Sequence, residues 1–138
     1  MTRSKTRENA FILVFEHLLR DDDINELYEI AGEVEEITVN DDVKKIVSGT
    51  VEHSTEIEEI ISGYSKSRTI QRISKVNLAI LEIAVFEALY DEKVPVNIAI
   101  SEAVKLAEMY TYPEDVSFIN GVLGAFSRDR KSGEKNNG

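Results

Sequence analysis

The sequence contains no cysteine among its 138 residues. This absence excludes disulfide bonds, zinc sites built on thiolates and cysteine nucleophiles. No apolar run approaches the roughly 18 to 20 residues that span a bilayer, and the polar, basic start of the chain lacks the apolar segment and cleavage site of a signal peptide. We therefore expect a cytoplasmic protein without contact to a membrane.

The sequence is also poor in the motifs of catalytic and ligand-binding sites. Its seven glycines are scattered singly, so it has no phosphate-binding loop, and it has no G-x-S-x-G motif. The two histidines, His17 and His53, lie far apart, which favours ordinary surface histidines over a metal site. The acidic runs 21–23 and 33–36 lack the ligand spacing of a calcium loop and are interpreted as helix caps and a solvated loop. We expect neither an enzyme nor a bound cofactor.

The composition and length of the chain are typical of one compact soluble domain. Its hydrophobic content of 42% lies well above that of disordered chains, and its length suits a single core, which typically serves about 100 to 150 residues. The formal net charge of −10 argues against a protein that coats nucleic acid through its overall field, because that mode needs net positive charge.

The basic residues are nevertheless clustered. Eleven of the 16 fall in three stretches: Arg3, Lys5 and Arg7; Lys66, Arg68, Arg72 and Lys75; and Arg128, Arg130, Lys131 and Lys135. Arg3 and Arg7 lie one turn apart if their segment is helical, so the pair could clamp successive phosphates. From the residues alone, an anion site and simple surface charge both remain open.

Apolar residues recur at helical spacing along almost the whole chain, and no convincing strand or internal repeat is present. The predicted helices cover 4–19, 24–32, 41–64, a short turn at 70–73, 77–90, 97–110 and a segment after Pro113. The helix at 77–90 is apolar nearly all round and is therefore expected at the centre of the fold. The prediction is an all-α protein of about seven helices, with a disordered polar tail at 128–138.

Three stretches in combination resemble the NusB family of transcription antitermination factors. They are "TRENAFILVFEHL", similar to the opening Arg-x-x-A-x-x-x-L/F helix of the family; "RISKVNLAILEIAVFEALYDEKVPVNIAISEAVKLAEMY", similar to its central pattern; and "SFINGVL", similar to its F-[VI]-N-G-V-L. The resemblance covers essentially all of residues 3–127. It implies one helical domain, 1–127, built of two packed subdomains at about 3–64 and 67–127.

The same resemblance implies a function. Members of this family pair with NusE, a small-subunit ribosomal protein, and the pair binds the boxA element of nascent ribosomal RNA leaders. Loaded onto RNA polymerase with other Nus factors, the pair suppresses premature termination, and no reaction is catalysed. Because an acidic protein with a small basic patch neutralises few phosphates, we expect its affinity for boxA-type RNA to rise when the basic partner is present.

The resemblance also assigns residues by position. The expected RNA contacts are Arg3, Lys5, Arg7, Phe15 and Phe118, with core packing as the alternative for the two aromatic residues. The expected partner contacts are Tyr64, Arg72 and Asn77, with Glu82 nearby. At Asn77 the family often has an acidic residue, and at Glu82 it has Arg, so the details of the partner contact stay open.

Two alternative functions fit the residues less well. One is a helical adaptor that binds only proteins, in which the basic N-terminus is surface charge. The other is the NusB-like domain of an RNA methyltransferase, which would need a catalytic domain beyond Gly138, where this chain ends. The sequence patterns fit both a monomer and a homodimer.

Overall fold

The computed structural model describes the backbone of residues 1–137 and the side chains of residues 1–130. In this part of the chain the elements are α1 Arg3–Arg20, α2 Ile24–Gly32, α3 Asp41–Glu52, α4 Ser54–Tyr64, the 3-10 helix η1 Ile70–Arg72, α5 Lys75–Tyr90, α6 Val96–Tyr110 and α7 Pro113–Asn137. The all-α prediction is confirmed. Among the described residues, no helix combines the length and apolar character that a membrane crossing requires.

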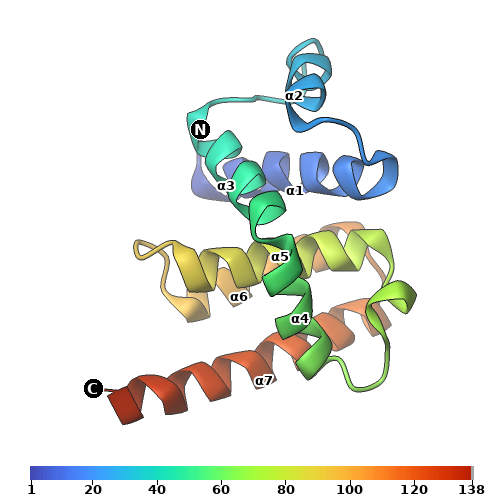
Figure 1. Ribbon diagram of the computed structural model, residues 1–138. Coiled ribbons are helices and arrows are strands. Elements are labelled where there is room, and N and C mark those ends of the chain that lie inside the picture. The colour runs from blue at the N-terminus through green and yellow to red at the C-terminus, as the bar shows by residue number, and fades with distance from the viewer. Residues whose placement is uncertain (138) are drawn as a thin grey trace.

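Helix α5 lies at the centre of the molecule. It packs against α1, α3, α4, α6 and α7. In Figure 1, α1 runs above α5 and α7 runs below it, while α3 and α4 descend across both α1 and α5. Helix α2 projects at the end farthest from α7 and packs against α1.

The sequence of α5 explains its central position. Of its 16 residues, 12 are buried, and they lie on every side of the helix. A helix without a polar face has no side that can remain in water, so its neighbours must surround it. The buried set includes three polar residues, Asn77, Glu82 and Glu87, which therefore need partners inside the fold.

Side-chain caps fix where several helices begin. The Thr2 hydroxyl accepts a hydrogen bond from the Lys5 N–H at 3.1 Å, and Asn40 Oδ1 accepts one from the Val43 N–H at 2.9 Å. Each cap satisfies an N–H group that the first helical turn leaves without a partner. Helix α1 ends at Asp21, whose backbone is left-handed with a φ of 53°.

The prediction of one long helix at 41–64 is wrong in one respect. The structure divides this segment into α3 and α4 at His53. His53 leaves helical geometry, with φ −99° and ψ 15°, and its ring stacks on Tyr90 with the centroids 4.1 Å apart. A single non-helical residue leaves the spacing of the apolar residues nearly unchanged. The periodicity of the sequence therefore carries no signal of this break.

The polar tail, expected to be disordered at 128–138, begins within helix α7. The structure describes this helix as far as Asn137, and residue 138 lies outside the described part of the chain. The Tyr64 hydroxyl donates a hydrogen bond to Asp129 Oδ2 at 2.6 Å, which fastens the start of this segment to α4. Lys, Arg and Glu are good helix formers, so the composition of the tail is compatible with a helix.

Two helical glycines should respond in opposite ways to replacement by alanine. A Cβ at Gly49 would overlap the Phe86 ring, whereas a Cβ at Gly121 would meet nothing within 4 Å. We expect Gly49→Ala to lower the free energy of unfolding by about 1 to 3 kcal/mol. Gly121→Ala should raise it by up to about 1 kcal/mol, because alanine is the better helix former. Urea unfolding followed by circular dichroism measures both, and a stabilised Gly49→Ala variant would contradict the packing described here.

Candidate nucleic-acid interface

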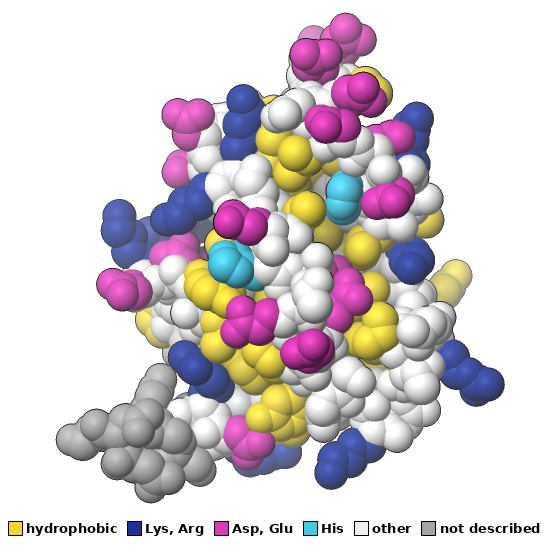
Figure 2. Space-filling model, in the orientation of Figure 1, with side chains coloured by type: hydrophobic (Ala, Val, Ile, Leu, Met, Phe, Trp, Pro, Cys, Tyr) yellow, Lys and Arg dark blue, Asp and Glu magenta, His cyan; other side chains and the backbone are white. Residues whose placement is uncertain are grey.

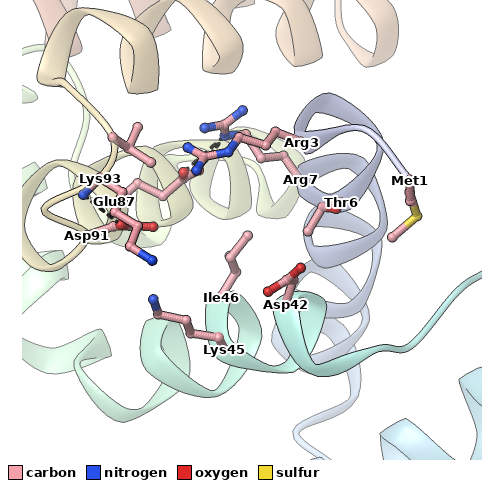
Figure 3. A pocket seen from close by; sticks show the side chains of 11 residues that line it. Met1, Arg3, Thr6, Arg7, Asp42, Lys45, Ile46, Glu87, Asp91 and Lys93 are labelled. Atoms are coloured by element: carbon pink, nitrogen blue, oxygen red, sulfur yellow. Dashed lines mark hydrogen bonds and ion pairs between the residues drawn. The ribbon is translucent and has the colours of Figure 1, made fainter.

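A pocket of about 180 Å³ lies where the first turn of α1 meets the start of α3 and the end of α5 (Figure 3). We call it the α1 pocket. Its charged lining residues are Arg3, Arg7, Lys45 and Lys93, opposed by Asp42, Glu87 and Asp91. Basic residues thus outnumber acidic ones here, in a chain whose net charge is −10.

The wall of the pocket contains a buried ion pair. Arg7 Nε donates to both carboxylate oxygens of Glu87, at 2.8 and 3.0 Å, and the two side chains are only 5% and 3% exposed. Burial raises the pKa of Glu87, and the bond from Arg7 opposes that rise. Arg7, predicted as an RNA contact, therefore faces α5 rather than solvent. Its role in this structure is to hold α1 against α5.

Three exposed cations surround this pair: Arg3 on α1, Lys45 on α3 and Lys93 in the turn after α5. Within the described part of the chain, none of the three forms an ion pair. Figure 3 shows Arg3 beside Arg7, and Lys45 reaching from α3 toward the turn that carries Lys93. Because a phosphate oxygen is attracted by each of these cations, the α1 pocket is suited to bind a phosphodiester.

Lys45 and Lys93 are absent from the residues expected from the sequence. Lys93 directly follows Asp91 and Glu92, and Lys45 belongs only to the pair Lys44 and Lys45 shortly after Asp41 and Asp42, so neither lies in one of the three basic stretches. Only the packing of α1, α3 and α5 brings them near Arg3. No local pattern could have identified them.

Lys5 lies on a different face of α1 from Arg3. It forms an ion pair with Glu8 at 2.9 Å, and Glu8 also accepts a hydrogen bond from the Tyr110 hydroxyl at 2.7 Å. Both bonds lower the pKa of Glu8, and the bond from Lys5 has the larger effect. The three basic residues predicted as one cluster are thus separated: Arg3 is exposed in the pocket, Lys5 faces α6 and Arg7 is buried.

The two aromatic candidates lie in separate surroundings. The half-buried Phe118 ring is covered by the Arg68 guanidinium, 4.2 Å from its centroid, and Arg68 also lies 3.9 Å from Asp115. Phe15 is half-buried beside Phe11, with 6.3 Å between the ring centroids. An unstacked base can stack on an arginine plane as well as on an aromatic ring, so the Arg68 and Phe118 pair offers a surface for one.

Of the four residues expected to contact a protein partner, only Arg72 is exposed. Tyr64 is half-buried and donates its hydroxyl to Asp129, and this bond raises the pKa of Tyr64. Asn77 is 0% exposed and donates through Nδ2 to Asp115 at 2.9 Å. Glu82 is 2% exposed, so Asn77 and Glu82 both lie inside the fold of the chain by itself.

Known sequences of one family match this chain over nearly its whole length. The model of the NusB family matches residues 4–128. The transcription antitermination protein NusB of Clostridium botulinum (strain Kyoto / Type A2) is 37% identical over 140 aligned residues, which cover 90% of this chain and 98% of that protein. NusB of Finegoldia magna is 35% identical over 134 residues, with coverages of 96% and 98%.

Comparison with solved structures identifies the same fold. NusB of T. maritima superposes with a TM-score of 0.81 at 27% identity, covering 93% of this chain and 92% of that one. A crystal structure of the antitermination factors NusB and NusE in complex with dsRNA also matches with a TM-score of 0.81 at 27% identity, covering 92% of this chain and 96% of that chain.

The buried ion pair predicts a large loss of stability when one partner is removed. Arg7→Ala leaves the Glu87 carboxylate buried without its partner, so we expect it to lower the free energy of unfolding by about 3 to 5 kcal/mol. The double variant Arg7→Met, Glu87→Leu removes both charges and should recover most of this loss. Urea unfolding measures both variants. A loss below about 1 kcal/mol for Arg7→Ala would show that the pair is not buried.

Proposed function

Because this chain belongs to the NusB family, we propose that it is a transcription antitermination protein that binds RNA together with NusE. A relative of the same fold is known as a complex of NusB and NusE with dsRNA. The proposal is carried to particular residues by the α1 pocket, where Arg3, Lys45 and Lys93 form no ion pair with any described residue of this acidic molecule. The RNA that we propose is the boxA element of ribosomal RNA leaders.

In this proposal the α1 pocket holds the RNA backbone. Arg3 presents a planar fork that suits two phosphate oxygens, and Lys45 and Lys93 act as mobile point charges. Arg7 acts indirectly, because its bond to Glu87 positions the helix turn that carries Arg3. These contacts are to phosphate and so provide affinity and register rather than base selection.

Base selection would then come from other residues. Phe118 under Arg68 provides a stacking surface, and Phe15 stays a second candidate. Arg72 and Tyr64 remain our proposal for the contact with NusE. The pair would act within RNA polymerase complexes that contain other Nus factors, through binding alone and without a catalysed reaction.

The charge distribution supports a dependence on the partner. Figure 2 shows acidic side chains gathered at the top of the molecule, over α2, and further acidic and basic side chains scattered over the rest of this face. A chain with a net charge of −10 repels RNA through its overall field and attracts a basic protein. NusE would therefore add positive charge next to a site that neutralises few phosphates by itself.

The contribution of the α1 pocket can be tested with two neighbouring lysines. Lys45 lines the pocket, whereas Lys44 lies over the Tyr28 ring, 5.4 Å from its centroid, outside the pocket. We expect Lys45→Ala to weaken binding of boxA-type RNA by the complex with NusE several-fold, and to reduce the slope of log affinity against log salt by about 0.7. Lys93→Ala should behave alike and Lys44→Ala should leave both quantities unchanged. Fluorescence anisotropy at several salt concentrations measures them.

The same assay separates this proposal from a helical adaptor without RNA contact. An adaptor would bind NusE normally and would give equal RNA affinity for the Lys44→Ala, Lys45→Ala and Lys93→Ala complexes. That result would refute the α1 pocket as an RNA site.

A further titration tests the role of the partner. We expect the chain alone to bind boxA-type RNA at least about tenfold more weakly than its complex with NusE, because few phosphates are neutralised without the basic partner. Labelled RNA is titrated with the chain, with NusE and with both. Equal affinities for the chain and the complex would contradict the dependence.

A further inference from the structure

A second cavity, of about 400 Å³, lies between α1, the junction of α3 with α4, and α5. We call it the Glu82 cavity. Its polar lining residues are His17, Asp21, Thr50, Ser54, Glu58 and Glu82, and neither lysine nor arginine lines it. It shares no residue with the α1 pocket.

Three of the residues that line this cavity each carry a buried polar atom that lacks a hydrogen-bond partner within the described part of the chain. These atoms are His17 Nδ1, Thr50 Oγ1 and Glu82 Oε1. Thr50 is 0% and Glu82 is 2% exposed, so bulk water does not satisfy them. A buried polar atom without a partner costs about 1 to 3 kcal/mol, and native proteins rarely leave three together. This concentration at one cavity indicates that a bound group completes the site.

The chemistry of these atoms specifies the kind of group. A carboxylate oxygen and a hydroxyl oxygen accept hydrogen bonds, and so does an imidazole nitrogen when it carries no proton. Glu58 and the exposed Asp21 also line the cavity, and the charge of Glu58 raises the pKa of Glu82. The cavity therefore combines free acceptors with negative charge.

We propose that the Glu82 cavity binds one organic cation through a guanidinium or primary ammonium group. Such a group carries three to five N–H donors and a positive charge, which match the acceptors and carboxylates of the cavity. A metal ion fits less well, because among the described residues no group of three or more His, Cys, Asp or Glu could hold one. This site is independent of the proposed RNA function, and either can fail without the other.

Ionisation of Glu82 links this binding to pH. Burial first, and then the nearby Glu58, raise the pKa of Glu82 to about 8, while Lys75 opposes the rise. The empty cavity is therefore expected to hold Glu82 protonated at neutral pH, and an entering cation displaces that proton. The other titratable groups that line the cavity are His17 on α1, Asp21 directly after α1 and Glu58 on α4, while α3 contributes only Thr50 and Val51.

The first test is calorimetric titration of the full chain with agmatine, which carries both cationic groups, at about pH 8.5. We expect saturable binding of one molecule, at least about tenfold weaker in Glu82→Gln and weakened in Glu58→Gln. Glu59→Gln removes the same charge from the exposed face of α4 and should bind like the unchanged chain. The uncharged butylurea should not bind.

The pH dependence separates the proposed site from general attraction to an acidic surface. Affinity for agmatine should rise by up to about tenfold per pH unit between pH 6 and 8 and then level off, because one proton is released on binding. Glu82→Gln should abolish this rise. If affinity is the same in all variants or does not change with pH, the cavity holds only water and the proposal is overturned.

Asp21→Asn provides a variant that does not disturb the core, since asparagine tolerates the left-handed backbone of this position. It should weaken agmatine several-fold with unchanged thermal stability, and unchanged affinity would count against the proposal. One further ligand distinguishes the possible sources of the cation. Binding of acetyl-Gly-Arg-Gly-amide as tight as that of agmatine points to a protein side chain, binding of agmatine alone points to a free amine, and binding of neither overturns the site.

Discussion

The bond between Arg7 and Glu87 fastens the N-terminal turn of α1 to the end of α5, and the arrangement of the charged surface depends on it. Helix α5 is buried on every side, so each carboxylate on it needs a partner inside the fold. The partner of Glu87 is Arg7, which lies 80 positions earlier in the sequence. This pairing removes one cation from the surface but places Arg3 beside α3 and the turn after α5. The α1 pocket is a consequence of that placement.

The second buried carboxylate of α5, Glu82, has no such partner among the residues that the structure describes. It lies at a cavity with other unsatisfied acceptors, and burial keeps its pKa near 8. The two carboxylates thus have opposite consequences for the surface. Glu87 helps to arrange the cations of the α1 pocket, which suit a phosphate. Glu82 lines the acidic Glu82 cavity, which suits a cation. Both features arise from the same constraint, a central helix that has no face in water.

The positions of most helices could be predicted from the sequence, because apolar spacing and capping residues such as Asp23 are local signals. The break at His53 could not, since the apolar spacing continues across it. The surroundings of the site residues could not be predicted for a different reason. Arg7 was expected to contact RNA, and Asn77 and Glu82 were expected to contact the partner, yet their burial is set by helices distant in sequence. Lys45 and Lys93 were missed for the same reason, because only tertiary packing brings them to Arg3.

The central claim is that the α1 pocket holds RNA phosphate when NusE is present. It is tested most directly by amide chemical shifts of the labelled chain in its complex with NusE, recorded before and after addition of a short boxA-type RNA. The account predicts that the largest RNA-induced changes include Arg3, Lys45 and Lys93, together with residues near Phe118. Changes confined to other surfaces, with these three residues unaffected, would contradict it.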